Sequence, residues 1–139
     1  YVDADGKERQ PIMLHRVLLG SLERFTGALL EHYAGALPLW LSPVQVAILP
    51  IKAEAEPYSQ EVKSPLEAEG VRVELDNRNE TLNKRIREAE LTKIPYLLVV
   101  GEREVKDRKV AVRKKGKGDT GTMSIEGFIS QIKEELKNK

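Results

Sequence analysis

Hydrophobic residues in the first third of the chain recur with a period typical of a helix. Apolar side chains lie three or four positions apart at Leu18, Leu22, Phe25, Leu29 and Tyr33. This spacing predicts one amphipathic helix. A polar segment with an Asp-Gly turn signal precedes it, and the proline-punctuated linker ALPLWLSP follows it. We therefore expect a domain boundary near residue 42, with residues 1–42 and 43–139 as separate units.

Beyond residue 43 the pattern alternates between strand and helix character. Apolar, β-branched runs predict strands at 44–49, 71–75 and 96–100, and amphipathic stretches predict helices at 55–69 and 79–91. Strands that alternate with helices imply a partly parallel sheet covered by helices.

The C-terminal third adds strands of a different kind. A charged turn is expected from Gly101, and residues 108–115 alternate as a strand with Val110 and Val112 inward. A turn and a short strand follow, and residues 124–137 predict a closing amphipathic helix. The fold class is therefore α/β, with a mixed, mostly parallel sheet of about five strands flanked by helices and preceded by an N-terminal amphipathic helix.

A proline interrupts the first helix pattern of this domain. A proline inside a helix costs about 3 kcal/mol, and Pro65 lies near the end of the 55–69 stretch. Ser64 could cap a new helix, with Pro65 in its first position and Glu67 completing a capping box. We therefore expect a kink or a restarted helix at this point.

Length and composition limit the class of protein. The 139 residues suit one domain and a little more, and the absence of cysteine excludes disulfides and cysteine-based zinc sites. The apolar runs are too short to span a bilayer. Because the chain starts at Tyr1 without a leader pattern, we expect a soluble, cytoplasmic protein that begins inside a longer gene product and does not contact a membrane.

Charge is balanced overall but unevenly distributed. The formal charge is +1, from 23 basic and 22 acidic side chains. Acidic residues predominate over residues 53–76, and basic residues predominate over residues 103–117. Such segregation can steer a polyanion onto one face. A simply solvated, lysine-rich hairpin is the alternative.

One surface carries side chains suited to reading nucleic acid. Asn79, Asn83 and Arg87 are spaced four residues apart in the second helix stretch, away from its apolar stripe, and Arg113 comes from the later strand. Amides and guanidinium groups hydrogen-bond base edges, and RNA readers use them on helix faces and sheet edges. Asn79 could equally be the N-cap of its helix, and Arg87 could be a solvated helix residue.

Hydrolase and phosphate-loop chemistry is not indicated. The two histidines, His15 and His32, lie in no recognisable nucleophile motif. The glycine-rich segment GKGDTG lies between two predicted strands and not between a strand and a helix, so it predicts a turn and not a phosphate-binding loop.

Two stretches of the chain resemble a known family. The segment PIMLHRVLLGSLERFTGALLEHYAG resembles the third signature motif of class II aminoacyl-tRNA synthetases, in the version of the threonyl-tRNA synthetases. The segments LPLWLSPVQVAIL, DNRNETLNKRIREAEL, IPYLLVVG and KVAVR resemble, in the same order, the C-terminal anticodon-binding domain of class IIa enzymes. The resemblance covers about residues 8–137, and MLHR…GSLERF is its specific part.

The resemblance implies roles in the N-terminal segment. Arg24 matches the motif arginine that holds ATP phosphate, and His15 matches one of three zinc ligands. Both could not face one site from a single helix, since nine residues at 100° each leave them half a turn out of phase. We therefore expect PIMLH to be extended and the helix to begin near Arg16 or Val17.

The resemblance also implies an anticodon site. The family's anticodon-contacting positions fall on Asn79, Arg87, Lys93, Glu104 and Arg113. Lys93 departs from the arginine of many relatives, which removes a bidentate, stacking-capable group. The Glu104 carboxylate can accept from base amino groups, although it could instead be a turn carboxylate beside Lys106.

For the full enzyme, the resemblance implies ATP-dependent joining of threonine to its tRNA, with zinc and Mg-ATP, in a homodimer. This chain lacks most of that active site, so we expect it to be inactive alone, to bind no cofactor tightly and to expose an apolar patch on its first helix. Two alternatives remain open: a stand-alone RNA-binding or regulatory module, and a protein-interaction module, each built on the same fold.

Overall fold

A mixed five-stranded sheet organises the C-terminal two thirds of the chain in the computed structural model, which describes residues 1–137. The strands lie in the order β2-β1-β3-β4-β5. Their bounds are Val46–Pro50 (β1), Val73–Leu75 (β2), Tyr96–Val100 (β3), Lys109–Lys114 (β4) and Gly118–Ser124 (β5). The helices are Leu22–His32 (α1), Glu56–Ala68 (α2), Leu82–Leu91 (α3), Glu102–Asp107 (α4) and Ile125–Lys137 (α5).

Strand direction divides the sheet into two parts. β1 pairs in parallel with β2 and β3, and β4 runs antiparallel to both β3 and β5. β1 and β3 are apolar along their whole length and buried on both faces, as central parallel strands require. The predicted fold class is confirmed.

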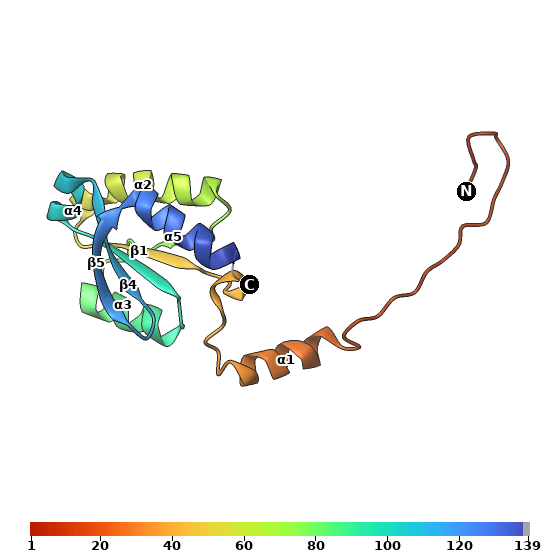
Figure 1. The fold of residues 1–139 in the computed structure, drawn as a ribbon, viewed down its shortest axis with the longest axis horizontal. Coiled ribbons are helices and arrows are strands. Elements are labelled where there is room, and N and C mark those ends of the chain that lie inside the picture. The colour runs from red at the N-terminus through yellow and green to blue at the C-terminus, as the bar shows by residue number, and fades with distance from the viewer. Residues whose placement is uncertain (138–139) are drawn as a thin grey trace.

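Helices cover the two faces unequally. α2 and α5 pack on one face, where Val62, Leu66, Phe128 and Ile132 join a single apolar cluster with the inward side chains of the sheet. α3 lies on the other face, over a smaller cluster around Leu49 (Figure 1). On this second face β4 and β5 stay exposed.

The carboxyl ends of the parallel strands meet at one end of the sheet. The chain leaves β1 through α2 to reach β2 on one side, and leaves β2 through α3 to reach β3 on the other side. The loops after Pro50 and Val100 therefore lie at the point where the strand order reverses, between β1 and β3. Open α/β sheets bind ligands at such points.

The N-terminal part stands away from the sheet (Figure 1). Gly6, with φ of 74°, supports the predicted Asp-Gly turn, and PIMLH forms neither helix nor strand. The predicted helix start near Arg16 or Val17 is wrong: α1 begins at Leu22. Gly20 has a φ of 67° and Ser21 caps the helix by accepting from the Arg24 amide. A left-handed residue and an N-cap together fix the start of the helix.

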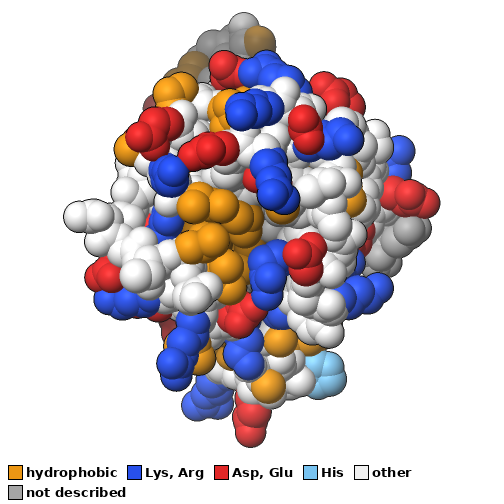
Figure 2. Space-filling model, turned by 90° about the vertical axis from the view of Figure 1, so that its left-hand side faces the viewer, with side chains coloured by type: hydrophobic (Ala, Val, Ile, Leu, Met, Phe, Trp, Pro, Cys, Tyr) orange, Lys and Arg blue, Asp and Glu red, His pale blue; other side chains and the backbone are white. Residues whose placement is uncertain are grey.

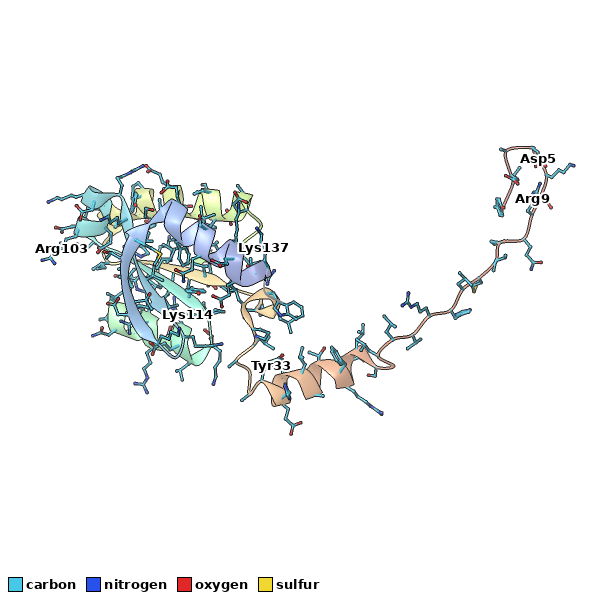
Figure 3. All side chains as sticks on the ribbon, in the orientation of Figure 1. Asp5, Arg9, Tyr33, Arg103, Lys114 and Lys137 are labelled. Atoms are coloured by element: carbon cyan, nitrogen blue, oxygen red, sulfur yellow. The ribbon has the colours of Figure 1, made fainter. Side chains whose placement is uncertain are left out.

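The expected apolar patch on α1 is confirmed, because no residue of this helix is buried. Leu22 is 69% exposed and Phe25 is 42% exposed. Figure 3 shows Tyr33, just after the helix, at the end of α1 that is nearer the sheet.

The predicted break at Pro65 is wrong. α2 is one helix from Glu56 to Ala68, and the Ser64 hydroxyl donates to the Gln60 carbonyl instead of capping a new helix. Val62 and Leu66, on either side of the proline, are both fully buried. Burial of such side chains contributes about 1.5–3 kcal/mol each, which outweighs a proline cost of about 3 kcal/mol.

The predicted charged turn after Gly101 is also wrong, since residues Glu102–Asp107 form the short helix α4. The Glu104 carboxylate accepts from the Gly101 amide at 2.9 Å, which closes the first turn. A capping contact of this kind replaces the apolar periodicity that a longer helix would show.

Candidate nucleic-acid interface

The five positions singled out as anticodon contacts spread along the sheet from one end to the other. Glu104 lies at the carboxyl end of the parallel strands, in α4. Asn79 precedes α3 and Arg87 lies within it. Lys93 follows α3, and Arg113 pairs with Leu97 near the start of β3, at the opposite end. The structure therefore groups Lys93 with Arg113 and separates both from Glu104.

Arg113 lies on the face of β4 that no helix covers. Its neighbours Val110 and Val112 point into the core on the other face, as the alternation predicted. The Arg113 guanidinium approaches the Glu90 carboxylate of α3 at 3.7 Å. Its Nε is buried and has no acceptor among the described residues. The side chain thus lies between α3 and the open face of β4.

The cross-strand partner of Arg113 is Asp119, and small or polar side chains follow along the same strand pair. Ala111 pairs with Thr122, and Lys109 pairs with Ser124. Thr122, Ser124 and Lys109 are exposed. This sheet face therefore presents short and polar side chains next to α3.

Helix α3 presents only part of the predicted face. Asn83 and Arg87 are exposed and one turn apart. Asn79 does not share this helical face, because α3 starts at Leu82 and Thr81 is its N-cap, accepting from the Lys84 amide. The N-cap interpretation of Asn79 is therefore wrong, and Asn79 instead lies in the preceding loop, exposed.

Two ion pairs hold the loop that carries Asn79. Arg78 binds the Asp76 carboxylate at 2.8 Å and the Glu88 carboxylate of α3 at 2.8 Å. The Arg78 hydrogen bond lowers the pKa of Asp76, and burial opposes this shift. The Asn77 amide donates to Glu56 of α2. The loop is thereby tied to helices on both faces of the sheet.

One arginine that the sequence pattern did not single out holds the strand ends to α3. Arg85 of α3 is only 3% exposed. Its guanidinium donates to the Asp76 carbonyl at 2.7 Å and to the Pro50 carbonyl at 2.7 Å. It fastens the carboxyl ends of β1 and β2 to α3. The sequence did indicate that Arg85 is buried, because it lies three residues after Leu82 and four before Ala89, on the apolar stripe of the helix.

Glu104 is half-buried, and its role differs from a simple turn carboxylate. Its Oε2 accepts from the Gly101 amide, and no ion pair with Lys106 forms among residues 1–137. None of the described residues donates to the other oxygen, Oε1. One acceptor position of this carboxylate thus stays available to a ligand.

The basic segment 103–117 is less uniform than its sequence indicates. Arg108 pairs with Glu61. Lys114 pairs with Glu135 at 2.7 Å and lies over the ring of Tyr96 (Figure 3). Cations without an ion-pair partner in the described chain are Arg103, Lys106, Lys109, Lys115 and Lys117. The basic face is therefore divided between α4 and the β4–β5 hairpin.

Three cations gather at the other end of the interface. Burial lowers the pKa of Lys115, and the neighbouring charge of Lys93 lowers it further. Lys93 has a left-handed backbone with φ of 64°. Arg113 adds a third positive charge at this end of the sheet.

The two N-terminal candidates are both exposed. Arg24 lies in the first turn of α1, and His15 lies seven residues before that helix. Among the described residues, no group of three His, Cys, Asp or Glu side chains could hold a metal ion. A zinc site needs at least three protein ligands, so His15 could serve one only with ligands from outside this chain.

The fold and the interface define an α/β domain with cationic, amide and carboxylate groups around an open sheet face. The chain belongs to the family of anticodon binding domains, whose model matches residues 45–135. The predicted resemblance to an anticodon-binding domain is confirmed. No helix in residues 1–137 is long and apolar enough to cross a membrane.

Curated relatives match the whole chain and confirm the predicted resemblance to threonyl-tRNA synthetases. It is 54% identical over 139 residues to the threonine–tRNA ligase of Acetivibrio thermocellus, covering 100% of this chain and 22% of that protein. The relation to the threonine–tRNA ligase of Aquifex aeolicus is similar, at 52% identity and the same coverage. The chain thus spans about a fifth of the length of these relatives.

A solved structure has the same fold. The RNA-binding domain of threonyl-tRNA synthetase from Cryptosporidium parvum Iowa II is 36% identical, with a TM-score of 0.77, covering 84% of this chain and 29% of that chain. A prolyl-tRNA synthetase structure from Cryptosporidium parvum is 29% identical, with a TM-score of 0.68, covering 74% of this chain and 22% of that one.

Proposed function

We propose that this chain is the anticodon-binding part of a threonine–tRNA ligase, with residues 43–139 as the RNA-reading domain. The family match over residues 45–135 and the full-length alignment with threonine–tRNA ligases support the proposal. In this function the domain docks the anticodon loop of threonine tRNA and so selects the tRNA that the ligase charges.

The observation that carries the proposal is the position of Arg113 beside α3 on an uncovered sheet face. Unstacked loop bases are read by hydrogen bonds to their edges from such positions. Arg113 and Arg87 offer paired N–H donors, Asn79 offers an amide, and Glu104 offers an acceptor. Lys93 at the far end meets backbone phosphate.

The N-terminal segment, residues 1–42, belongs in this proposal to the catalytic domain of the full ligase. There Arg24 binds ATP phosphate, and His15 is one of the zinc ligands, with the remaining ligands outside this chain. The full ligase uses zinc and Mg-ATP, acts as a homodimer and works in the cytoplasm. This chain alone activates no threonine.

A matched pair of variants separates base reading from charge attraction. Arg113→Ala should weaken binding to threonine tRNA transcripts by about 1–3 kcal/mol and reduce discrimination between anticodon variants. Lys109→Ala, on the same strand and exposed, should weaken binding equally for all anticodons. Lys109 serves better than Lys114, because the Glu135 pair holds Lys114 in place.

Filter binding or fluorescence anisotropy at a fixed salt concentration measures both effects. If Arg113→Ala and Lys109→Ala change the affinity for every anticodon alike, Arg113 reads no base. Binding that ignores the anticodon altogether favours a general RNA-binding module, and the absence of any RNA binding favours a protein-interaction module.

A further inference from the structure

The segment that joins α1 to β1 is packed against the domain. This connector, residues 37–45, contains the short 3-10 helix Leu39–Leu41. Its side chains Leu39, Ser42 and Gln45 are no more than 6% exposed, and Leu39 belongs to the apolar cluster beneath α2 and α5. Segments between two domains commonly allow the domains to move relative to one another, whereas this one is partly built into a core.

Arg72 holds the backbone of the connector through its guanidinium. The residue directly precedes β2. Its Nε donates to the Ser42 carbonyl at 3.0 Å and the Pro43 carbonyl at 3.2 Å, and its Nη2 donates to the Ser42 carbonyl at 2.7 Å and the Trp40 carbonyl at 2.9 Å. A planar guanidinium has donors in fixed directions and can hold several acceptors at once, whereas a lysine ammonium is a point charge on a flexible stem.

Gln45 and Ser42 complete this clamp from inside. The Gln45 Nε2 donates to the Leu39 carbonyl at 2.9 Å, and its Oε1 accepts from the Arg72 amide at 2.9 Å. The Ser42 hydroxyl donates to the Pro38 carbonyl at 3.1 Å. Buried backbone carbonyls need hydrogen-bond partners, and these three side chains supply them along the connector.

The bonds of the connector begin where those of α1 end. The Ala36 amide donates to the Tyr33 carbonyl at 2.8 Å, which closes the end of the helix. The Leu37 carbonyl accepts from the Ser42 hydroxyl at 3.3 Å. A single peptide bond separates the two sets, so the direction of α1 is tied closely to the domain.

The clamp lies away from the proposed RNA interface. Arg72 and Trp40 line a hollow with Lys133 and Leu136 of α5, on the side of the sheet opposite α3. Figure 1 shows the connector at the end of the sheet nearer α1, and Figure 2 views the other end, where charged side chains surround an apolar centre. Loss of the Arg72 side chain should therefore leave Glu104 and the open face beside α3 unaltered.

We propose that Arg72 is a positioning residue for the reaction of the full ligase, because it makes the connector a rigid joint between the RNA-reading domain and residues 1–42. Charging requires that a tRNA be held at its anticodon loop and at the end that receives threonine at the same time. How readily the second contact forms depends on the geometry of the segment between the two sites. Arg72 contacts neither part of the tRNA and acts through the connector carbonyls. The inference rests on the function proposed above.

The first test measures the joint in this chain. The chain has no cysteine, so spin labels can be attached through Glu31→Cys in α1 and Gln60→Cys in α2, both at exposed positions. Pulsed electron spin resonance then gives the distribution of distances between the labels. It should be narrow with Arg72 intact, broader with Arg72→Lys and broadest with Arg72→Met. Lys133→Met is the matched control and should leave it narrow, because Lys133 lies in the same hollow but pairs with Glu69.

The second test measures charging by the full ligase. Arg72→Met should lower kcat for threonine tRNA about tenfold and leave KM for that tRNA within about twofold, because the tRNA still binds but reaches the active site less often in the right geometry. Arg72→Lys should recover part of the loss, and Lys133→Met should match the unaltered ligase. All three variants of the 139-residue chain should bind the tRNA as the unaltered chain does. Thermal unfolding checks the fold of each.

Three results would overturn the inference. A broad distance distribution in the unaltered chain, or an equally narrow one in Arg72→Met, means that Arg72 makes no rigid joint. Broadening without a loss of kcat means that the joint does not position the tRNA for charging. A loss of tRNA affinity in the 139-residue chain that matches the loss of charging means that Arg72 acts in binding.

The proposed function is tested separately by anticodon discrimination of the unaltered chain. If discrimination persists, each of the three results removes only the role of Arg72. If the unaltered chain does not discriminate anticodons, the proposed function fails and the role of Arg72 in charging fails with it, whereas the distance distributions still decide whether the joint is rigid.

Discussion

Helices α1 and α5 carry similar apolar stripes in sequence but lie in different surroundings. In α5, Phe128 and Ile132 are fully buried against the sheet. In α1 no residue is buried, and Phe25 is 42% exposed. An amphipathic pattern therefore predicts a helix, whereas the partner of its apolar face depends on the rest of the fold. The core of the domain draws on Leu39 as well as on residues 46–132, and no residue of α1 is buried in it.

The two phenylalanines of the chain give the largest expected contrast. Phe128→Ala removes a fully buried ring that packs edge-on against Tyr96, so the free energy of unfolding should fall by about 3–5 kcal/mol. Phe25→Ala should change it by less than about 0.5 kcal/mol. Urea denaturation measures both. Similar losses in the two variants would mean that α1 packs on the domain in solution.

Helix α3 offers a second comparison, between the buried Arg85 and the exposed Arg87. Arg85→Met removes the donors to the Pro50 and Asp76 carbonyls, so the free energy of unfolding should fall by about 2–3 kcal/mol. Arg87→Met, at an exposed position, should cost less than about 0.5 kcal/mol while weakening RNA binding. An equal loss of stability would show that the buried bonds of Arg85 contribute little.

Acid should weaken the loop before α3. The Arg78 hydrogen bond lowers the pKa of Asp76 in the folded state. The resulting stability is present above the unfolded-state pKa of about 4 and is lost as pH falls through the lower folded value. Asp76→Asn should therefore flatten the decline of stability from about pH 5 to pH 2.

Asp107→Asn, at an exposed position in α4, serves as the control in the same titration. Its stability curve should follow that of the unaltered chain. If Asp76→Asn also follows that curve, Asp76 contributes no pH-dependent stability.

The smallest effect is local to α1. Ser21→Ala removes the acceptor of the Arg24 amide, which costs the helix about 1 kcal/mol. Amide hydrogen exchange should quicken in the first turn of α1, while the unfolding midpoint of residues 45–137 should not change. A shift of that midpoint would couple α1 to the domain.

The order of strands and helices was predictable because burial of their apolar faces sets the hydrophobic periods that the sequence displays. The short helix α4 was not predictable in this way, since Glu104 and the Gly101 amide form its start without an apolar stripe. The break at Pro65 was wrongly predicted, because tertiary burial of Val62 and Leu66 outweighs a local penalty.

In the candidate site, too, the positions that depend on local pattern were predictable and those that depend on the fold were not. The outward position of Arg113 came directly from strand alternation. Asn79 was placed on the wrong element, because a threonine two residues later caps the helix instead. The contact between Ile51 and Gly101 joins residues fifty positions apart, and local pattern cannot show a contact set by strand pairing.

The affinity of the chain for threonine tRNA transcripts with altered second or third anticodon bases tests the central claim most directly. At constant salt, the proposed function predicts that each altered base weakens binding by about 1–3 kcal/mol, as expected when a base-reading contact is lost. Equal affinity for all anticodons would contradict the claim that this domain reads the anticodon.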